Sequence, residues 1–286
     1  MTNVISFCVS GENKNYFYNG ALTAIKSVKL TNPHMPIVIF YDFLNEFQKS
    51  MLSGCKLIRV QTLYKTSHRR RELTDAIWFK FHLDALEGVD KALFLDCDLV
   101  VLDSLDEIFK LEGKIVACGR HGRLNKEFVD AEKVKANENI KDSDLLFNTG
   151  VICFDRKFWV HEKIKDKVLE ILNMYGDSNF KNPDQGVANI LAYRYGGFTN
   201  LSHRYNYLLD MIDEKPLVVI KNPMGVKAPY HDDDFIRILH WNGAKKPWRF
   251  KTRIKYSRNK KSYYSCYKQF ANHGSLKELR ISVDEK

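Results

Sequence analysis

Short apolar runs alternate with helix-like segments through the first two thirds of this 286-residue chain, and this alternation constrains the fold more than any other feature. Strands are expected at residues 4–9, 37–41, 57–60, 92–95 and 115–118. Helices are expected between them at residues 16–30, 43–52 and 74–86, with Thr74 as the N-cap of the last. Such alternation is typical of βαβ units. The sequence therefore predicts an α/β fold with a mostly parallel central sheet flanked by helices.

The last third of the chain continues the pattern less regularly. A strand is expected at residues 147–154, helices at 158–174 and 184–195, and late strands at 217–220 and 235–239. The length suits one large α/β domain or two small ones, and the 44% hydrophobic content is ample for a core.

Two further features concern the compartment in which the protein works. No run approaches the roughly 18 to 20 apolar residues of a membrane span, and the N-terminus lacks a basic segment before an apolar run. We therefore expect a cytoplasmic protein. The six cysteines form no Cys-x-x-Cys pair, so we expect reduced and mostly buried thiols.

Two carboxylates follow directly after one of the expected strands. Asp96 and Asp98 end the run 91–95, which is apolar on both faces, as in a parallel sheet covered by helices. Ligands bind beyond the carboxyl ends of such strands, and an acid pair there usually holds a metal. The alternative is a capped strand end without a ligand. The similar pairs at 142–144 and 232–234 have polar surroundings and are expected to be solvated turns.

A second group of polar residues follows the expected strand 235–239. His240 can ligate a metal such as Mn²⁺, Gly243 lets the backbone approach a phosphate, and Lys246 supplies a compact positive charge. A lone histidine at a strand end is more often structural, but this spacing allows all three residues to share one ligand. Together with the acid pair, they predict a site for a hard divalent ion and a diphosphate.

The order of five motifs gives the chain a family resemblance. The motifs are Asn15-Tyr16, Phe94-Leu95-Asp96-Cys97-Asp98, Phe147-Asn148-Thr149-Gly150-Val151, Asp184-Gln185 and His240-x-x-Gly243-x-x-Lys246-Pro247-Trp248. In these motifs, over residues 4–248, the chain resembles glycosyltransferase family 8. That family includes bacterial lipopolysaccharide galactosyl- and glucosyltransferases and glycogenin, and the last motif is highly specific for it.

The resemblance implies a nucleotide-sugar-binding fold of the GT-A type, a UDP-sugar donor, Mn²⁺ or Mg²⁺ as cofactor, and retention of anomeric configuration. It implies that Asp96, Asp98 and His240 ligate the metal. It also implies that Gly243 and Lys246 hold the phosphates of the donor.

The resemblance assigns the remaining site residues to the nucleoside and the sugar. Tyr16 would stack on or flank the uracil, with Asn15 near the nucleotide. Lys80 stands where the family often has an arginine near the donor. The residues that would line the donor sugar and act in catalysis are Asn148, Asp184 and Gln185.

Elementary chemistry agrees with these implied roles. Breaking the bond between sugar and phosphate leaves negative charge on UDP, which a divalent ion and Lys246 stabilise. The sugar develops positive charge, which the side-chain oxygen of Gln185 stabilises from the opposite face. Because an amide is a poor nucleophile, we favour attack by the acceptor on the front face, without a covalent intermediate.

The chain departs from the family pattern at two places. After the first expected strand, residues 10–14 stand where the family has an acidic or hydroxylic residue for the uracil. After the strand that ends near Ala117, residues 118–123 stand where the family often has an aspartate that contacts the sugar. The contacts to the base and the identity of the donor sugar therefore stay open.

The net charge of +10 is localised near the C-terminus. Residues 245–270 hold ten Lys or Arg and no Asp or Glu, which leaves 35 basic and 35 acidic residues in the rest of the chain. Aromatic residues alternate with these cations, a mixture suited to an anionic membrane surface. The alternative is a solvated helix face whose aromatics pack on the body. We divide the chain into a catalytic domain, residues 1–248, and a basic aromatic extension, residues 249–286.

The leading hypothesis is a metal-dependent retaining hexosyltransferase that moves glucose or galactose from a UDP-hexose to a glycan or glycolipid acceptor such as lipopolysaccharide. The basic extension would place it on the inner face of the membrane. One alternative is a membrane- or nucleic-acid-binding protein with an inactive sugar-nucleotide site, although the neutral body makes nucleic acid the weaker partner. Another is an enzyme that glycosylates itself on tyrosine, as glycogenin does.

Overall fold

The central sheet of the computed structural model has seven strands in the order β3-β2-β1-β4-β7-β6-β8. The structure describes residues 2–67, 74–209, 217–243, 246–249 and 261–271. The strands are β1 (Asn3–Val9), β2 (Ile37–Tyr41), β3 (Lys56–Arg59), β4 (Lys91–Leu95), β6 (Ile115–Arg123), β7 (Leu145–Asp155) and β8 (Thr199–Asn200). The first four are mutually parallel, β7 runs antiparallel to β4 and β6, and β8 runs parallel to β6. The predicted mostly parallel sheet is confirmed.

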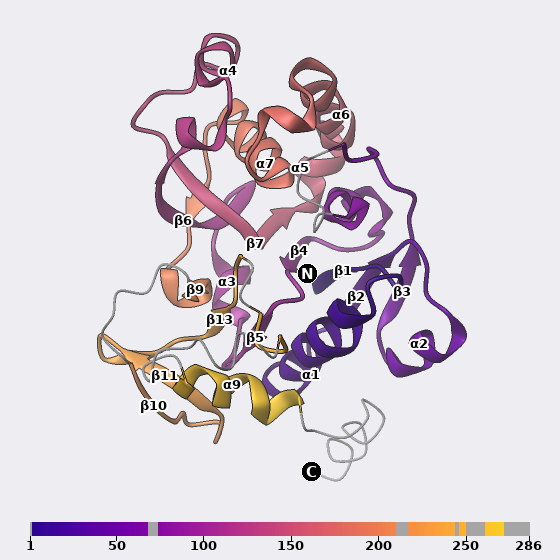
Figure 1. Ribbon diagram of the computed structural model, residues 1–286, viewed down its shortest axis with the longest axis vertical. Helices are drawn as coiled ribbons and strands as arrows, with labels where there is room; N and C mark the ends of the chain where they lie inside the picture. Colours follow the sequence, from indigo (N-terminus) through magenta and orange to yellow (C-terminus); the bar gives the residue numbers. More distant parts are fainter. Residues whose placement is uncertain (1, 68–73, 210–216, 244–245, 250–260, 272–286) are drawn as a thin grey trace.

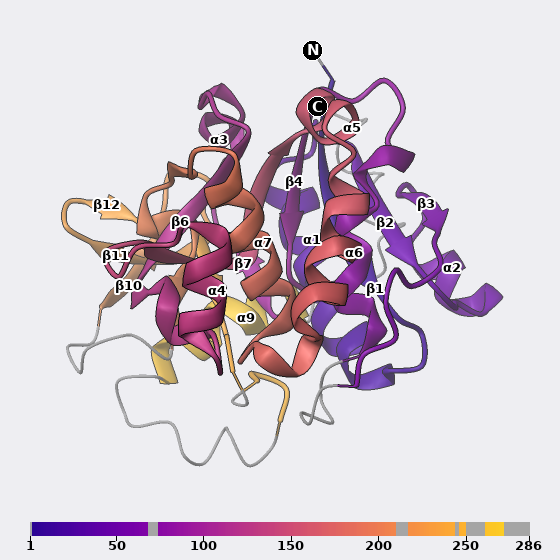
Figure 2. The same cartoon turned by 90° about the horizontal axis from the view of Figure 1, so that it is seen from above.

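Helices cover both faces of this sheet, as Figures 1 and 2 show. Ile5 and Phe7 of β1 pack into a cluster with α1 (Leu22–Thr31) on one face. Val4 packs into a second cluster with α6 (Ile164–Tyr175) and α7 (Pro183–Arg194) on the other face. Because successive strand residues point to opposite faces, a strand covered on both sides must be apolar throughout. This explains the continuous apolar runs in the sequence.

A smaller sheet, in the order β5-β13-β9, carries part of the site. Its strands are β5 (Leu99–Val101), β13 (Ile238–His240) and β9 (Tyr207–Leu208). The antiparallel pairing of β5 with β13 sets His240 opposite Leu99. Because Leu99 follows the acid pair directly, this register brings the histidine beside Asp98.

Another small sheet holds β10 (Val218–Lys221), β11 (Lys227–His231) and β12 (Asp234–Phe235). The predicted late strand at 217–220 corresponds to β10. The predicted strand at 235–239 is two strands, β12 and β13, with Ile236 and Arg237 between them. Strands β9 and β11 were not predicted.

The predicted helix at residues 74–86 is wrong. This segment forms two 3₁₀ turns, η2 (Asp75–Phe81) and η3 (Leu83–Ala85), and the side chain of Thr74 makes no cap hydrogen bond. Trp78, Phe79 and Phe81 are all buried within a few residues of one another, so this segment is not apolar on one stripe alone. Packing of these aromatic rings against the sheet therefore outweighs local helix preference.

Three other predicted helices differ in extent. The segment at 16–30 begins with a π-helical turn, η1 (Tyr16–Ala21), before α1. The segment at 43–52 shortens to α2 (Glu46–Met51), because Asn45 and Gln48 form a reciprocal cap at its start. The segment at 158–174 is split into α5 (Arg156–His161) and α6, with Lys163 in the left-handed region at φ 48°. By contrast, the helix predicted at 184–195 is confirmed as α7.

The remaining helices are short. α3 (Asp106–Lys110) follows β5, and α4 (Ala131–Glu138) follows the 3₁₀ turn η4 (Leu124–Glu127) at the end of β6. Brief 3₁₀ turns also occur at η5 (Asp177–Asn179) and η6 (His203–Tyr205).

Asp142 and Asp232 lie in turns, as predicted, but Asp234 begins β12 and forms an ion pair with Arg204, so the prediction for 232–234 is only partly confirmed. The side chains of Asp142 and Asp232 are each 71% exposed. Asp232 and Asp233 adopt left-handed backbone conformations, with φ of 46° and 62°. Unlike Asp96 and Asp98, neither pair follows a strand of the central sheet: Asp144 precedes β7, and Asp232 follows β11 of a small sheet.

The described part of the C-terminal extension is packed on the body. In α9 (Lys261–Ala271), the side chains of Tyr263, Tyr267 and Phe270 are buried. The Tyr267 hydroxyl donates to the Asn19 carbonyl at 2.8 Å, and α9 lies beside α1 in Figure 1. These aromatics therefore follow the second of the two expectations, packing on the body. Residues 250–260, which hold five of the ten cations, lie outside the described residues.

Two further expectations concern helices and thiols. In the described ranges, no helix combines the length and the apolar composition that a membrane crossing requires. All six cysteines are free thiols. Cys118, Cys153 and Cys266 are buried, while the other three are only partly buried, so burial is less general than expected.

Candidate active site

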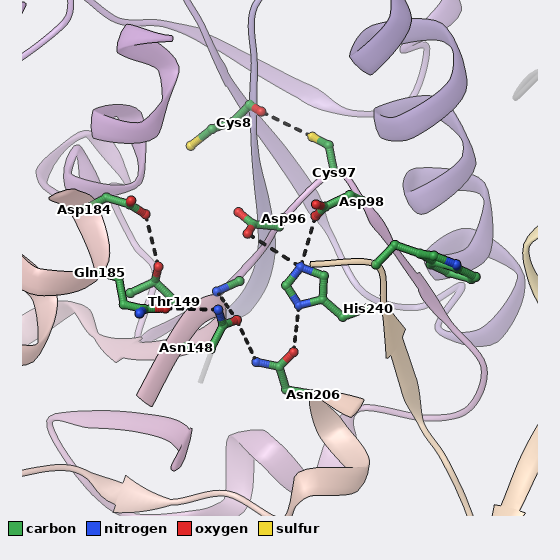
Figure 3. Close-up of polar contacts among 12 residues, drawn as sticks. Cys8, Asp96, Cys97, Asp98, Asn148, Thr149, Asp184, Gln185, Asn206 and His240 are labelled. Atoms are coloured by element: carbon green, nitrogen blue, oxygen red, sulfur yellow. Dashed lines mark hydrogen bonds and ion pairs between the residues drawn. The ribbon is translucent and has the colours of Figure 1, made fainter. Parts of the chain in front are cut away.

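The predicted metal ligands meet at one point between the two sheets. Asp96 and Asp98 follow β4, and His240 ends β13. The Nε2 atom of His240 lies 3.1 Å from Oδ1 of Asp98 and 3.9 Å from Oδ2 of Asp96 (Figure 3). One ligand atom from each residue lies within 4.8 Å of the other two. The structure therefore brings all three predicted ligands together.

The residues present fit a divalent cation. Carboxylate oxygens suit Mg²⁺ and Mn²⁺, and an added imidazole extends the set toward softer metals such as Mn²⁺. Gly150 of β7 lies directly against the His240 and Asp96 side chains of this cluster. A Cβ at this position would lie 2.3 Å from Cε1 of His240 and 2.7 Å from Oδ2 of Asp96. Only glycine therefore leaves the ligand side chains where they stand.

Two lysines balance the buried carboxylates. Burial by itself raises the pKa of Asp98, but the charges of Lys246 and His240 and their hydrogen bonds lower it below its usual value. Lys246 contacts Asp98 directly and also donates to the Trp241 carbonyl at 2.8 Å. Burial raises the pKa of Asp96 despite the opposing charge of Lys80. The two carboxylates are thus electrostatically different.

Lys80 joins the acid pair to the predicted sugar site. It is 3% exposed, and its Nζ lies 2.6 Å from Oδ2 of Asp184 and 3.9 Å from Oδ1 of Asp96. Burial lowers the pKa of Lys80, but the charges of Asp184 and Asp96 outweigh this and raise it. The Thr149 hydroxyl also donates to Oδ2 of Asp184, at 3.0 Å. Asp184 is thereby held by a cation and a hydroxyl.

A chain of side-chain amides runs from the sugar site to the metal ligands (Figure 3). Asn148 Nδ2 donates to Gln185 Oε1 at 3.0 Å, and Asn206 Nδ2 donates to Asn148 Oδ1 at 3.0 Å. Asn206 Oδ1 then lies 2.8 Å from Nδ1 of His240. Because this oxygen only accepts, Nδ1 of His240 carries a proton, which leaves Nε2, on the side of the carboxylates, as the ring atom that can bind a metal. Asn206 therefore fixes the tautomer that a metal requires.

The nucleoside end of the site is built around Tyr16. Its ring packs edge-on against Trp248 at 5.3 Å between centroids, and Nζ of Lys246 lies 5.8 Å from the ring centre. Gly243 turns the chain between His240 and Lys246 at φ 74°, a conformation that favours glycine. Asn15 is exposed and does not line the cavity.

All of the predicted site residues except Asn15 line one cavity of about 410 Å³. This volume falls in the range of small-molecule sites, roughly 300 to 1,000 Å³. Ser10 and Asn13 also line it, so the segment 10–14 that departs from the family pattern does reach the cavity. Of the other departing segment, Cys118, Gly119, Gly122 and Arg123 are not in the lining.

Sequence reasoning missed two residues behind the cavity wall. Asn206 orients His240, and Glu127 accepts a hydrogen bond from Nε2 of Gln185 at 3.2 Å. Neither residue stands at the end of an apolar run or in one of the five motifs. No local pattern in the sequence distinguishes them from other Asn and Glu residues.

Comparison with known proteins agrees with this geometry. The model of the family described as "Glycosyl transferase family 8" matches residues 7–252. Lipopolysaccharide 1,2-glucosyltransferase of Escherichia coli K12 is 29% identical over 261 residues, covering 83% of this chain and 71% of that protein. General stress protein A of Bacillus subtilis is 24% identical and covers 74% and 72% of the two chains.

Solved structures share the fold. The galactosyltransferase LgtC, solved with donor and acceptor sugar analogues, superposes with a TM-score of 0.70 at 18% identity, covering 98% of this chain and 99% of that one. The glycosyltransferase GlyE of Streptococcus pneumoniae superposes with a TM-score of 0.64 at 18% identity, covering all of this chain and 64% of that one. With the family model matched over residues 7–252, this chain belongs to glycosyl transferase family 8.

Proposed function

We propose that this glycosyltransferase moves a hexose, glucose or galactose, from a UDP-hexose to a glycan or glycolipid acceptor, with retention of configuration and with Mn²⁺ or Mg²⁺. One observation carries the proposal. A cavity of about 410 Å³ gathers the acid pair, His240 and Lys246 at one end and Lys80, Asp184 and Gln185 at the other. This arrangement suits a molecule with a diphosphate and a sugar.

The first end of the cavity serves the leaving group. Asp96, Asp98 and His240 would hold a divalent metal, which would supply positive charge beside the leaving diphosphate. Lys246, 4% exposed, adds a second positive charge beside Asp98. In a site so shielded from water, fixed charges stabilise a developing anion strongly.

The other end of the cavity serves the donor sugar. The Gln185 carbonyl oxygen stabilises the positive charge that develops on the sugar, and Asn148 and Asp184 bind sugar hydroxyls. Lys80 holds Asp184 in place through their 2.6 Å contact. The acceptor hydroxyl attacks from the side of the leaving diphosphate, whose oxygen takes the proton. This geometry retains the anomeric configuration.

The nucleoside lies at the aromatic end. Tyr16, supported by Trp248, provides a flat surface for the uracil. Asn15 is exposed and does not line the cavity, so we assign it no contact to the nucleotide. Ser10 and Asn13, which line the cavity, are better placed for contacts to the base.

The proposed acceptor follows from the relatives. The similar Escherichia coli protein is named as a lipopolysaccharide 1,2-glucosyltransferase, which supports a glycan or glycolipid acceptor. Attachment to an anionic membrane through residues 245–270 stays a prediction with less support than before. Three of the four aromatic side chains of α9 that suggested it, Tyr263, Tyr267 and Phe270, are buried against the body.

A donor screen tests the proposed function. UDP release is followed with UDP-glucose, UDP-galactose, UDP-GlcNAc and UDP-GalNAc, with Mn²⁺ or with chelator, and thermal stabilisation is measured in parallel. We expect turnover with one of the two hexoses, lost in chelator. With simple glycosides as acceptors, the product should keep the α configuration of the donor. Absence of both turnover and stabilisation with every donor would refute the proposal.

A further inference from the structure

Glu127 is a buried carboxylate that contacts the active site from behind. It ends η4, the turn after β6, and is 3% exposed. Its Oε1 accepts from the main-chain N–H of Asn182 at 2.5 Å, and its Oε2 accepts from Nε2 of Gln185 at 3.2 Å. The Asn182 side-chain amide donates to both oxygens at 3.0 and 3.2 Å. Among the ion pairs of the described residues, none includes Glu127.

An ionised carboxylate accepts hydrogen bonds and cannot donate them. When Glu127 is ionised, the NH₂ group of Gln185 therefore faces it, which turns Gln185 Oε1 toward Asn148. A second contact agrees with this direction. The Gly150 main-chain N–H donates to Asn148 Oδ1 at 3.0 Å, which leaves the NH₂ of Asn148 facing Gln185 Oε1. Two independent anchors thus agree on which way the Gln185 amide points.

We propose that Glu127 is a positioning residue for sugar transfer: its carboxylate fixes the direction of the Gln185 side-chain amide, so that the oxygen rather than the NH₂ faces the cavity. This inference rests on the proposed function. The amide oxygen is the negative end of the dipole and stabilises the positive charge that develops on the sugar. A reversed amide presents its positive end there and opposes the reaction.

The two oxygens of Glu127 make the effect of substitution specific. In Glu127→Gln, the remaining side-chain oxygen keeps the hydrogen bond from the Asn182 main-chain N–H, because a buried N–H without an acceptor costs free energy of folding. The new NH₂ then takes the place of Oε2 and faces the NH₂ of Gln185. Two donors oppose each other, so the Gln185 amide either turns over or loses its contact.

A simpler role for Glu127 would be to hold the start of α7 through Asn182. The two roles differ in how substitutions combine. If Glu127 acts through Gln185, its substitution has no further effect once Gln185 is alanine. A residue that only stabilises the helix lowers activity in both backgrounds.

The experiment compares kcat for transfer in wild type, Glu127→Gln, Gln185→Ala and the double variant. Glu138→Gln is the control, because Glu138 is also a buried carboxylate but bonds Tyr175 and Arg194 away from the cavity. We expect Glu127→Gln to lower kcat about tenfold, with Mn²⁺ affinity within about twofold of wild type. The double variant should match Gln185→Ala, and Glu138→Gln should keep wild-type kcat. Equal losses from Glu127→Gln in both backgrounds would overturn the proposal.

A second readout needs no activity. The side-chain ¹H–¹⁵N signals of Gln185 are assigned by their disappearance in Gln185→Ala. We expect them to shift in Glu127→Gln and to stay in place in Glu138→Gln. Unchanged signals in Glu127→Gln would show that Glu127 does not orient Gln185. If the wild type turns over no donor, the proposed function fails, while these signals still decide the orientation.

Discussion

The buried carboxylates of this site differ in what neutralises them. Asp98 has Lys246 and His240 beside it, whereas Asp184 has Lys80. Glu127 has only amide donors, so burial raises its pKa to about 7 even though Asn182 and Gln185 lower it. Since the energy of a buried charge depends on its partners, these residues respond differently to pH and to substitution.

The raised pKa of Glu127 makes the stability of the fold depend on pH. The folded pKa of about 7 exceeds the reference value of 4.5, so the stabilising contribution is complete below pH 4.5 and is lost as pH rises through 7. Glu127→Gln cannot ionise and avoids this loss. We expect the free energy of unfolding of the variant to gain up to about 3 kcal/mol relative to wild type between pH 5 and pH 8. Urea unfolding at both pH values measures it, and a constant difference would contradict the account.

Gly150 is the residue on which the ligand geometry most depends. In Gly150→Ala, the new Cβ would meet His240 and Asp96 at 2.3 and 2.7 Å, so these side chains must move. We expect Mn²⁺ affinity to fall by about 10- to 100-fold in calorimetric titration. Gly122→Ala is the control, since a Cβ there meets nothing within 4 Å. Equal affinities in the two variants would show that the cluster does not form the metal site.

At the scale of elements, strand pairing assembles the site. β13 carries His240 to the acid pair through its pairing with β5, although 142 residues separate His240 from Asp98. The sequence predicted both motifs because each follows an apolar run. It did not predict β9 or the place of Asn206, because a two-residue strand has no periodicity to read.

Errors in the predicted helices have physical causes. Residues 74–86 contain helix-compatible side chains, but burial of Trp78, Phe79 and Phe81 selects 3₁₀ turns. The break between α5 and α6 at Lys163 could not be predicted, because no Gly or Pro lies near it in the sequence. The directions of the two helices follow from the packing of Trp159 and Ile164 in one core cluster. Tertiary packing decides where local preference is weak.

The docking of α9 is testable at this scale. Phe270 is 1% exposed, and its cluster includes Trp241 beside the active site. We expect Phe270→Ala to lower the free energy of unfolding by about 3 kcal/mol. Lys268→Ala, on the exposed side of the helix, should change it by less than about 0.5 kcal/mol. Similar urea midpoints for the two variants would mean that α9 is not docked as described.

For the molecule as a whole, the motifs predicted more than the composition. The alternation of apolar runs indicated the sheet, and the five ordered motifs indicated the family and nine of the ten predicted site residues that line the cavity. The net charge of +10 suggested that the extension binds a membrane surface. The described aromatic side chains of the extension instead pack in a hydrophobic cluster of the body. Charge and composition indicate a binding surface only when the side chains concerned are exposed. A single sequence does not show which side chains are exposed.

The sequence motifs do not predict which sugar and which acceptor the site selects. Cys118, Gly119, Gly122 and Arg123 do not line the cavity, and Glu127 lies just behind it. The central claim concerns the part of the site that is shared by every possible sugar: the metal ligands and the leaving diphosphate.

One measurement tests this claim most directly: Mn²⁺-dependent UDP release from the preferred UDP-hexose by Asp98→Asn, with Asp142→Asn as the matched control. Both substitutions remove one charge from an aspartate pair, but the side chain of Asp142 is 71% exposed in a turn. We predict at least a 100-fold loss of turnover in Asp98→Asn and a change within about twofold in Asp142→Asn. Undiminished turnover in Asp98→Asn, or in wild type with chelator, would contradict the account.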